Sequence, residues 1–122
     1  MAKSITLSKD ETKAYVADDY NGLVILDISD PSNIIQIGHF DTDGEAEYVV
    51  LSKDETKAYV ADGYNGLVIL DVSDPSNPVQ IGHFDTDGDA ISVTLSKDET
   101  KAYVADGNNG LVILDVSFFK NY

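Results

Sequence analysis

Two histidines are the side chains of this sequence best suited to proton transfer at neutral pH. His39 and His83 each lie in the segment GHFDTDG, which occurs twice, 44 residues apart. Histidine can act as a general acid or base. Both histidines obey a repeat, however, and no serine or threonine has a plausible base beside it in the sequence. We therefore predict a packing or surface role for both histidines and no catalytic residue.

Carboxylates form two short runs that could ligate a hard cation. Alternating acidic side chains around a glycine are typical of the first half of a calcium-binding loop. The glutamate that should close such a loop is missing, because Ser52 and Ser96 occupy its position. An acidic turn containing glycine accounts for the same residues, so we predict no metal site. The two runs are Asp41, Asp43 and Glu45, and Asp85, Asp87 and Asp89.

Three further aspartates, Asp27, Asp71 and Asp115, recur inside an apolar segment. We predict that they are buried hydrogen-bond acceptors that tie strands or turns together. The chain has no cysteine, which excludes disulfides, thiolate metal sites and cysteine nucleophiles. It also lacks the G-x-S-x-G, H-E-x-x-H, phosphate-loop and dinucleotide-binding motifs. We expect neither an enzyme nor a bound cofactor.

The charge of the chain restricts its partners. Asp and Glu number 22 against 8 Lys and Arg, which gives a formal net charge of −14. Binding to nucleic acid or to anionic lipid needs a basic surface, so we expect neither. No apolar run approaches the roughly 20 residues of a membrane-spanning helix, and the first residues, MAKSITLSKD, do not resemble a signal peptide.

The elements that position these residues are set by an internal repeat. LSKDETKAYVAD begins at Leu7, Leu51 and Leu95, a period of 44 residues. Only eight of 44 positions differ between residues 7–50 and 51–94, and the third copy differs from the second only where Asn108 replaces Tyr64. The chain therefore divides into units 1–44 and 45–88 and a truncated unit 89–122, which we expect to form one structural unit.

Each complete unit is predicted to contain four short strands. Residues 90–96 alternate apolar and polar side chains, KAYVAD follows after a polar turn, and Asn65-Gly66 gives a tight-turn signal before GLVILDVS. PVQIGHF supplies the fourth strand. The third strand is apolar on both faces, so it requires cover on both sides. Four strands in about 44 residues predict an all-β chain of four-stranded antiparallel β-propeller blades.

The segment YVADGYNGLVILDVSDPSNPVQIGHFDT resembles the LVIVD repeat, a propeller blade whose strands run from an inner strand through two middle strands to an outer strand. The resemblance covers all three units. It implies a parent protein that is exported or lies at the cell surface. It carries over no catalytic residues, because the family has none in common.

Three blades form only part of a propeller, since a closed ring has four to eight blades. Two chains would supply six, so we predict a head-to-tail homodimer with equivalent seams. The function that follows is a non-enzymatic, self-assembling scaffold or protein-interaction module, with another protein as a further partner. The alternative is a propeller that binds a ligand or cation at the mouth of its central channel.

The last unit ends in SFFKNY where an outer strand should follow. Residues 118–122 either form a stub of this strand or leave a three-stranded blade, and we expect the aromatic side chains to cover the exposed apolar edge.

Positions that differ between the units cluster near the inner strands. Lys3, Glu47 and Ile91 share one equivalent position, and Ser4, Tyr48 and Ser92 share another. These side chains are predicted to line or rim the channel, and simple drift at exposed positions remains the alternative. We also expect Lys3 to pair with Glu47 of the next blade.

Overall fold

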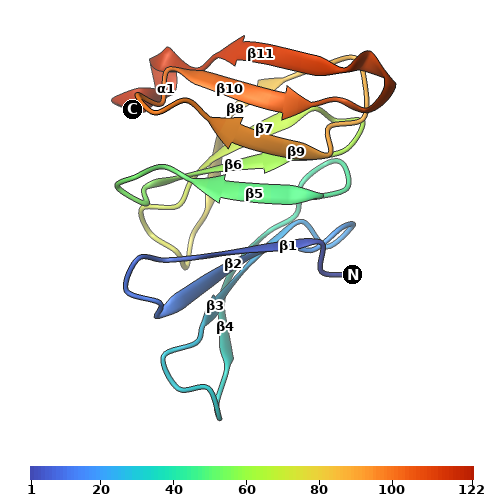
Figure 1. The fold of residues 1–122 in the computed structure, drawn as a ribbon. Coiled ribbons are helices and arrows are strands. Elements are labelled where there is room, and N and C mark those ends of the chain that lie inside the picture. The colour runs from blue at the N-terminus through green and yellow to red at the C-terminus, as the bar shows by residue number, and fades with distance from the viewer.

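The computed structural model describes residues 1–122 and consists of three antiparallel β-sheets (Figure 1). The strands of the first sheet, in sheet order, are β1 (Ser4–Leu7), β2 (Lys13–Ala17), β3 (Leu23–Asp27) and β4 (Ile35–Phe40). Those of the second are β5 (Tyr48–Leu51), β6 (Lys57–Ala61), β7 (Leu67–Asp71) and β8 (Val79–Phe84). The third contains β9 (Ser92–Leu95), β10 (Lys101–Ala105) and β11 (Leu111–Asp115). The predicted all-β fold is confirmed.

A polar turn of sequence SKDET joins the first two strands of each sheet. In the first copy, the Asp10 carboxylate accepts hydrogen bonds from the Thr12 amide, the Thr12 hydroxyl and the Ser8 hydroxyl. These bonds, those of Thr12 first, lower the pKa of Asp10 to about 2. The turn is thereby held by side chains that follow one another in the sequence, which explains why the hairpin forms in every unit.

The three sheets stack face to face, and their inner strands β1, β5 and β9 lie side by side (Figure 1). Hydroxyl groups tie the inner strands together: the Thr6 hydroxyl donates to the Val49 carbonyl at 2.7 Å, and the Val49 amide donates to the Ser4 hydroxyl at 3.1 Å. Ser4 therefore joins two inner strands.

Two apolar cores fill the two junctions between sheets. At the first junction Leu23 and Ile25 of β3 pack against Val60 and Leu70 of the second sheet. At the second junction Leu67 and Ile69 of β7 do the same against the third sheet. All four apolar residues of β7, Leu67 to Leu70, are fully buried. The predicted cover on both faces of this strand is confirmed for the middle sheet.

The third sheet has no fourth strand. Residues Gly107–Asn109 form a 3₁₀ turn, and Ser117–Lys120 form a single helical turn, α1, so the stub of an outer strand does not form. The Phe119 ring packs edge-on to Phe84 with ring centroids 6.2 Å apart. It therefore covers the second sheet, and the apolar edge of β11 stays uncovered, contrary to our expectation. No helix of the chain is long and apolar enough to cross a membrane.

Candidate functional site

The two histidines lie at exposed positions on the outer strands and contact a turn of their own sheet. The Nε2 atom of His39 lies 2.5 Å from the carbonyl oxygen of Asn21, and His83 makes the same contact with Asn65. Because a carbonyl oxygen only accepts, the Nε2–H group of each ring donates this hydrogen bond, which anchors the outer strand to the turn before the third strand. No serine, threonine or carboxylate forms a hydrogen bond with either ring in the structure.

The recurrent aspartates of the third strand are hydrogen-bond acceptors, but the prediction that they are buried is wrong. Asp27 and Asp71 are partly exposed and Asp115 is exposed. Each accepts from the hydroxyl and the amide of the serine two residues later; in the first copy this is Ser29. These hydrogen bonds lower the pKa of all three carboxyl groups. They close a local turn, and water screens their charge.

The buried carboxylates are Asp62 and Asp106, which the sequence analysis did not single out. Asp62 accepts hydrogen bonds from the Thr42 hydroxyl at 2.6 Å, the Gly44 amide at 2.9 Å and the Asn65 side chain at 2.9 Å. Burial raises its pKa despite these donors. Both aspartates end the segment KAYVAD, where an acidic residue after a buried strand recurs at a fixed position, and this was the available signal. They attach each sheet to the linker that precedes it.

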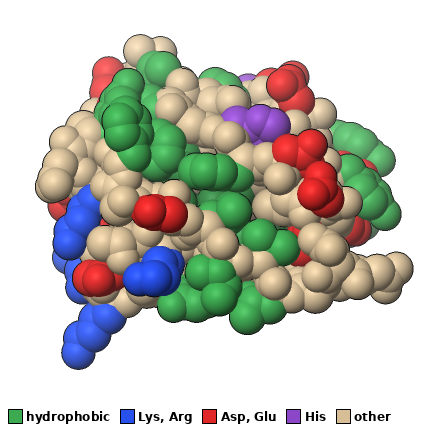
Figure 2. Space-filling model, turned by 90° about the horizontal axis from the view of Figure 1, so that it is seen from above, with side chains coloured by type: hydrophobic (Ala, Val, Ile, Leu, Met, Phe, Trp, Pro, Cys, Tyr) green, Lys and Arg blue, Asp and Glu red, His purple; other side chains and the backbone are tan.

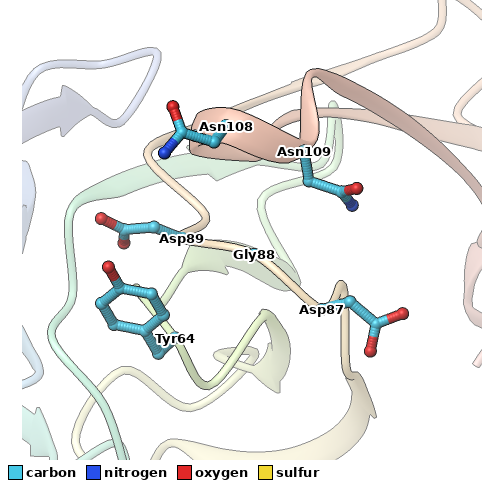
Figure 3. A pocket seen from close by; sticks show the side chains of 7 residues that line it. Tyr64, Asp87, Gly88, Asp89, Asn108 and Asn109 are labelled. Atoms are coloured by element: carbon cyan, nitrogen blue, oxygen red, sulfur yellow. The ribbon is translucent and has the colours of Figure 1, made fainter.

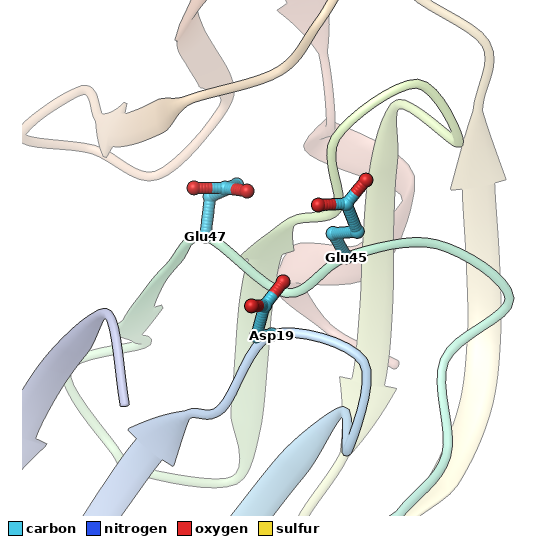
Figure 4. Close-up of side chains that lie close together, drawn as sticks. All are labelled: Asp19, Glu45 and Glu47. Atoms are coloured by element: carbon cyan, nitrogen blue, oxygen red, sulfur yellow. The ribbon is translucent and has the colours of Figure 1, made fainter. Parts of the chain in front are cut away.

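The predicted carboxylate runs are not assembled into one cluster. Asp41, Asp43, Asp85 and Asp87 are exposed, and Asp85 accepts from the Asp87 amide as in an ordinary Asp turn. The acidic group that the structure does assemble consists of Asp19, Glu45 and Glu47, each offering a carboxylate oxygen within 4.8 Å of the others (Figure 4). We call these three residues the acidic cluster.

The acidic cluster lies at the first junction, beside the start of the second inner strand (Figure 4). The backbone of Asp19 pairs with that of Ala46 through two hydrogen bonds of 2.9 Å. One Asp19 carboxylate oxygen is buried and has no hydrogen-bond partner. The Nζ atom of Lys3 lies 3.6 Å from Glu47, so the predicted pair is confirmed. Three carboxylates against one ammonium leave the cluster with negative charge.

All three members of the acidic cluster stand at positions where the repeats differ. The second junction has Gly63, Asp89 and Ile91 in their places. The backbone pairing is kept there, between Gly63 and Ala90, but the acidic group is lost. Asp19 also adopts a φ of 59°, a conformation that glycine enters more easily. The first junction therefore carries a charge arrangement that the fold does not require.

The second junction instead carries a polar hollow of about 560 Å³ (Figure 3). Asn108 borders it at the position where the second repeat has Tyr64, so a small amide replaces an aromatic ring. Tyr64 and Asp89 face the hollow from the opposite side (Figure 3). The lining is completed by Asp87, Gly88, Gly107 and Asn109.

The first and the last sheet each have one face that no other sheet of the chain covers. The upper face, on the third sheet, consists of Tyr103, Ala105, Leu111 and Ile113. Leu111 is 65% and Ile113 is 55% exposed. Figure 2 views this end of the molecule and shows hydrophobic side chains gathered across it. The lower face, on the first sheet, consists of the buried residues Ala14, Val16 and Val24, the partly buried Leu26, and Ile5, which is 61% exposed.

Solved structures resemble this fold at low sequence identity. A functionally unknown protein from Desulfotomaculum acetoxidans DSM 771 matches with a TM-score of 0.82 and 21% identity over 95% of this chain and 40% of that protein. A proposed 6-phosphogluconolactonase from Bacteroides uniformis ATCC 8492 matches with a TM-score of 0.79 and 16% identity over 93% of this chain and 36% of that one. The chain thus spans about two fifths of these proteins. At such identities the likeness concerns the fold.

No curated protein matches the chain. The model of the LVIVD repeat matches three successive segments, residues 1–42, 43–86 and 87–118, which together include nearly every residue. Each segment contains one of the three sheets, and the repeated sequence GLVILD includes the third strand of each. The chain belongs to the LVIVD-repeat family.

Proposed function

We propose that the chain is a non-enzymatic, self-assembling module in which two copies pack head to tail into a six-bladed ring. Its role is that of a scaffold for protein interaction. The residues with catalytic potential support this proposal, because both histidines and the recurrent aspartates make the same structural contacts in successive units.

The observation that carries the proposal is the difference in exposure between identical residues. Leu67 and Ile69 on the middle sheet are fully buried, whereas their counterparts on the third sheet, Leu111 and Ile113, are 65% and 55% exposed. The sequences of β7 and β11 are the same, so the difference comes from their surroundings: β7 has a sheet above it and an outer strand, β8, beside it, and β11 has neither. Exposed apolar faces of this kind mark protein interfaces.

The lower face has the composition needed to supply that neighbour. In the second and third sheets the residues equivalent to Ala14, Val16, Val24 and Leu26 are the same four types, and they cover the upper side of the preceding sheet. A second copy can therefore place its first sheet on the upper face with the contacts that the second and third strands make at the internal junctions. Such a contact joins two different faces, and two copies give two equivalent seams when the ring closes.

Sedimentation velocity on the whole chain at micromolar concentration tests the proposal. We expect a single species with twice the mass of the 13.2 kDa chain. A cooperatively folded monomer at all concentrations up to 100 µM would falsify the proposal. A series of growing species would refute closure at two copies, since head-to-tail contacts that do not close form open filaments.

A second candidate function, binding of a divalent cation at the acidic cluster, is favoured by the buried Asp19 oxygen without a partner. Hard cations take carboxylate oxygens. The double variant Asp19→Gly and Glu47→Ile gives the first junction the residues of the second at two of the three positions and leaves one acidic residue, Glu45, where the second junction has Asp89, so it is a matched control. We expect calcium to raise the melting temperature of the unmodified chain and to leave the variant unchanged. Equal shifts in both, or none in either, would contradict the candidate.

A further inference from the structure

The outer edge of β11 is a strand edge without a partner. The strands β3, β7 and β11 share the sequence LVILD. In the complete sheets β3 pairs with β4 and β7 pairs with β8, whereas β11 pairs only with β10. An unpaired edge presents backbone N–H and C=O groups that can bind an extended segment. The third sheet thus retains the strand that receives an outer strand in the other two.

The space for an outer strand is also retained. A side chain on Gly22 would collide with the carbonyl oxygen of Phe40, and one on Gly66 with that of Phe84, because the end of the outer strand lies against this turn. At the equivalent Gly110 nothing lies within 4 Å of such a side chain. The volume that the end of an outer strand fills in two sheets is therefore empty in the third.

A hydrogen-bond acceptor for the outer strand is present as well. The histidines of β4 and β8 contact the carbonyl oxygens of Asn21 and Asn65. The equivalent residue in the third sheet is Asn109, whose carbonyl oxygen contacts no histidine in the structure. Its carbonyl stands where a docked histidine ring would donate.

The C-terminal residues leave the edge accessible. Phe119 packs on Gly82 of β8, in the position where Pro75 lies on Gly38 of β4. The helical turn α1 therefore takes the place of the loop between the third and fourth strands. It lies over the neighbouring sheet and forms no ladder with β11.

We infer that the edge of β11 binds, in trans, an extended polypeptide segment with the pattern of β4 and β8, which is Val or Ile followed by Gln-Ile-Gly-His-Phe. In the register of β7 with β8, its phenylalanine pairs with Leu111, its histidine with Val112 and its glycine with Ile113. The isoleucine and phenylalanine supply apolar contact, as Ile81 and Phe84 do in the second sheet. The edge lies at the opposite side of the sheet from inner strand β9, so binding does not require ring closure.

Fluorescence anisotropy with a labelled peptide of residues 77–86, NPVQIGHFDT, tests the inference on the whole chain. We expect saturable binding at one peptide per chain, and at least tenfold weaker binding by a scrambled peptide of the same composition. Hydrogen exchange should then slow at residues 111–115 and stay unchanged at residues 23–27. Equal affinity for both peptides, or protection elsewhere only, overturns the inference.

A completed chain provides the matched control. Replacing residues 118–122 with DPSNPVQIGHFDT, the sequence that follows Ser73, supplies the outer strand in cis. This variant keeps β4 and β8 but should no longer bind the peptide. Unchanged binding would place the peptide on another strand and refute the assignment. Sedimentation of the same samples separates the two proposals, because a monomer that binds the peptide contradicts the ring and supports this inference.

Discussion

Replacement of Ile113 with alanine tests whether the upper face is an assembly interface. Ile113 is 55% exposed in the single chain, while its counterpart Ile69 is fully buried by the next sheet and the adjacent outer strand β8. If a second copy packs on the upper face as the third sheet packs on the second, Ile113 loses its exposed surface. Alanine removes most of the apolar surface that becomes buried and introduces no charge.

The size of the effect follows from this exposure. Burial of a whole isoleucine side chain contributes about 1.5–3 kcal/mol. The exposed 55% of Ile113 then contributes about 0.8–1.6 kcal/mol at each seam. A closed dimer has two seams, so the loss is about 1.6–3.2 kcal/mol, which raises the dissociation constant by roughly 15- to 200-fold.

The dissociation constant is measured by sedimentation equilibrium over a dilution series. The control is Ile35→Ala, which makes the same substitution at a residue that is 49% exposed. Its counterpart Val79 is still 48% exposed in the middle sheet, which has a neighbour on both sides, so blade packing does not cover this position. Equal dissociation constants for the two variants would refute an interface on the upper face, as would a change confined to Ile35→Ala.

Three further results are expected. Tyr59→Phe should raise the free energy of unfolding by about 1 kcal/mol in urea titrations, because the buried Tyr59 hydroxyl has no partner. Burial raises its pKa to about 12, so the stability lost by the unmodified chain as the pH rises from 10 through 12 should be smaller in the variant. Asp62→Ala should cost about 1–3 kcal/mol, since it orphans the buried donors around Asp62, and Asp62→Asn should recover most of this. Raising the ionic strength from about 0.01 M to 0.15 M should strengthen the dimer, since it shortens the screening length from roughly 30 to 8 Å and each chain carries −14; dissociation on adding salt would contradict this.

The architecture could be predicted from the sequence because every signal in it was local or periodic. The turn signal at Asn65-Gly66, the apolar run Leu67 to Leu70 and the 44-residue period each act within one unit. The Lys3 and Glu47 pair followed from the same register, since equivalent inner strands lie side by side.

The candidate site could not be predicted because it depends on contacts between units. The Asp19 carboxylate lies close to those of Glu45 and Glu47 across the first junction. The order of residues in the chain instead places Glu45 in a run with Asp41 and Asp43. The prediction of which aspartates are buried was also wrong. The long apolar strand suggested that Asp71 is buried, but this residue is the last of its strand and is partly exposed to water. Asp62 is the buried carboxylate, because the linker before the second sheet covers it.

The prediction that residues 118–122 cover the apolar edge of the last sheet was wrong for a different reason. An aromatic segment after a strand suggested continued strand pairing. The Phe119 ring instead packs against Phe84 of the second sheet. A side chain on Gly82 would collide with the Phe119 ring, so the glycine leaves a site into which the ring packs. The strand edge stays open because the neighbouring sheet, and not β11, offers buried apolar surface to the tail.

In this molecule the residues that pack the sheets together are different from the residues that form the acidic cluster and the polar hollow. The second and third strands that pack at the internal junctions use the same residue types in every unit, so a seam between two copies can reproduce the part of an internal junction that these strands make. The acidic cluster and the polar hollow lie at residues that differ between units. Because both junctions keep the same backbone pairing, Asp19 with Ala46 and Gly63 with Ala90, these residues can change without disturbing the stack. A ring of two copies would therefore contain the acidic cluster twice and the polar hollow twice. The packing of the sheets would not depend on either.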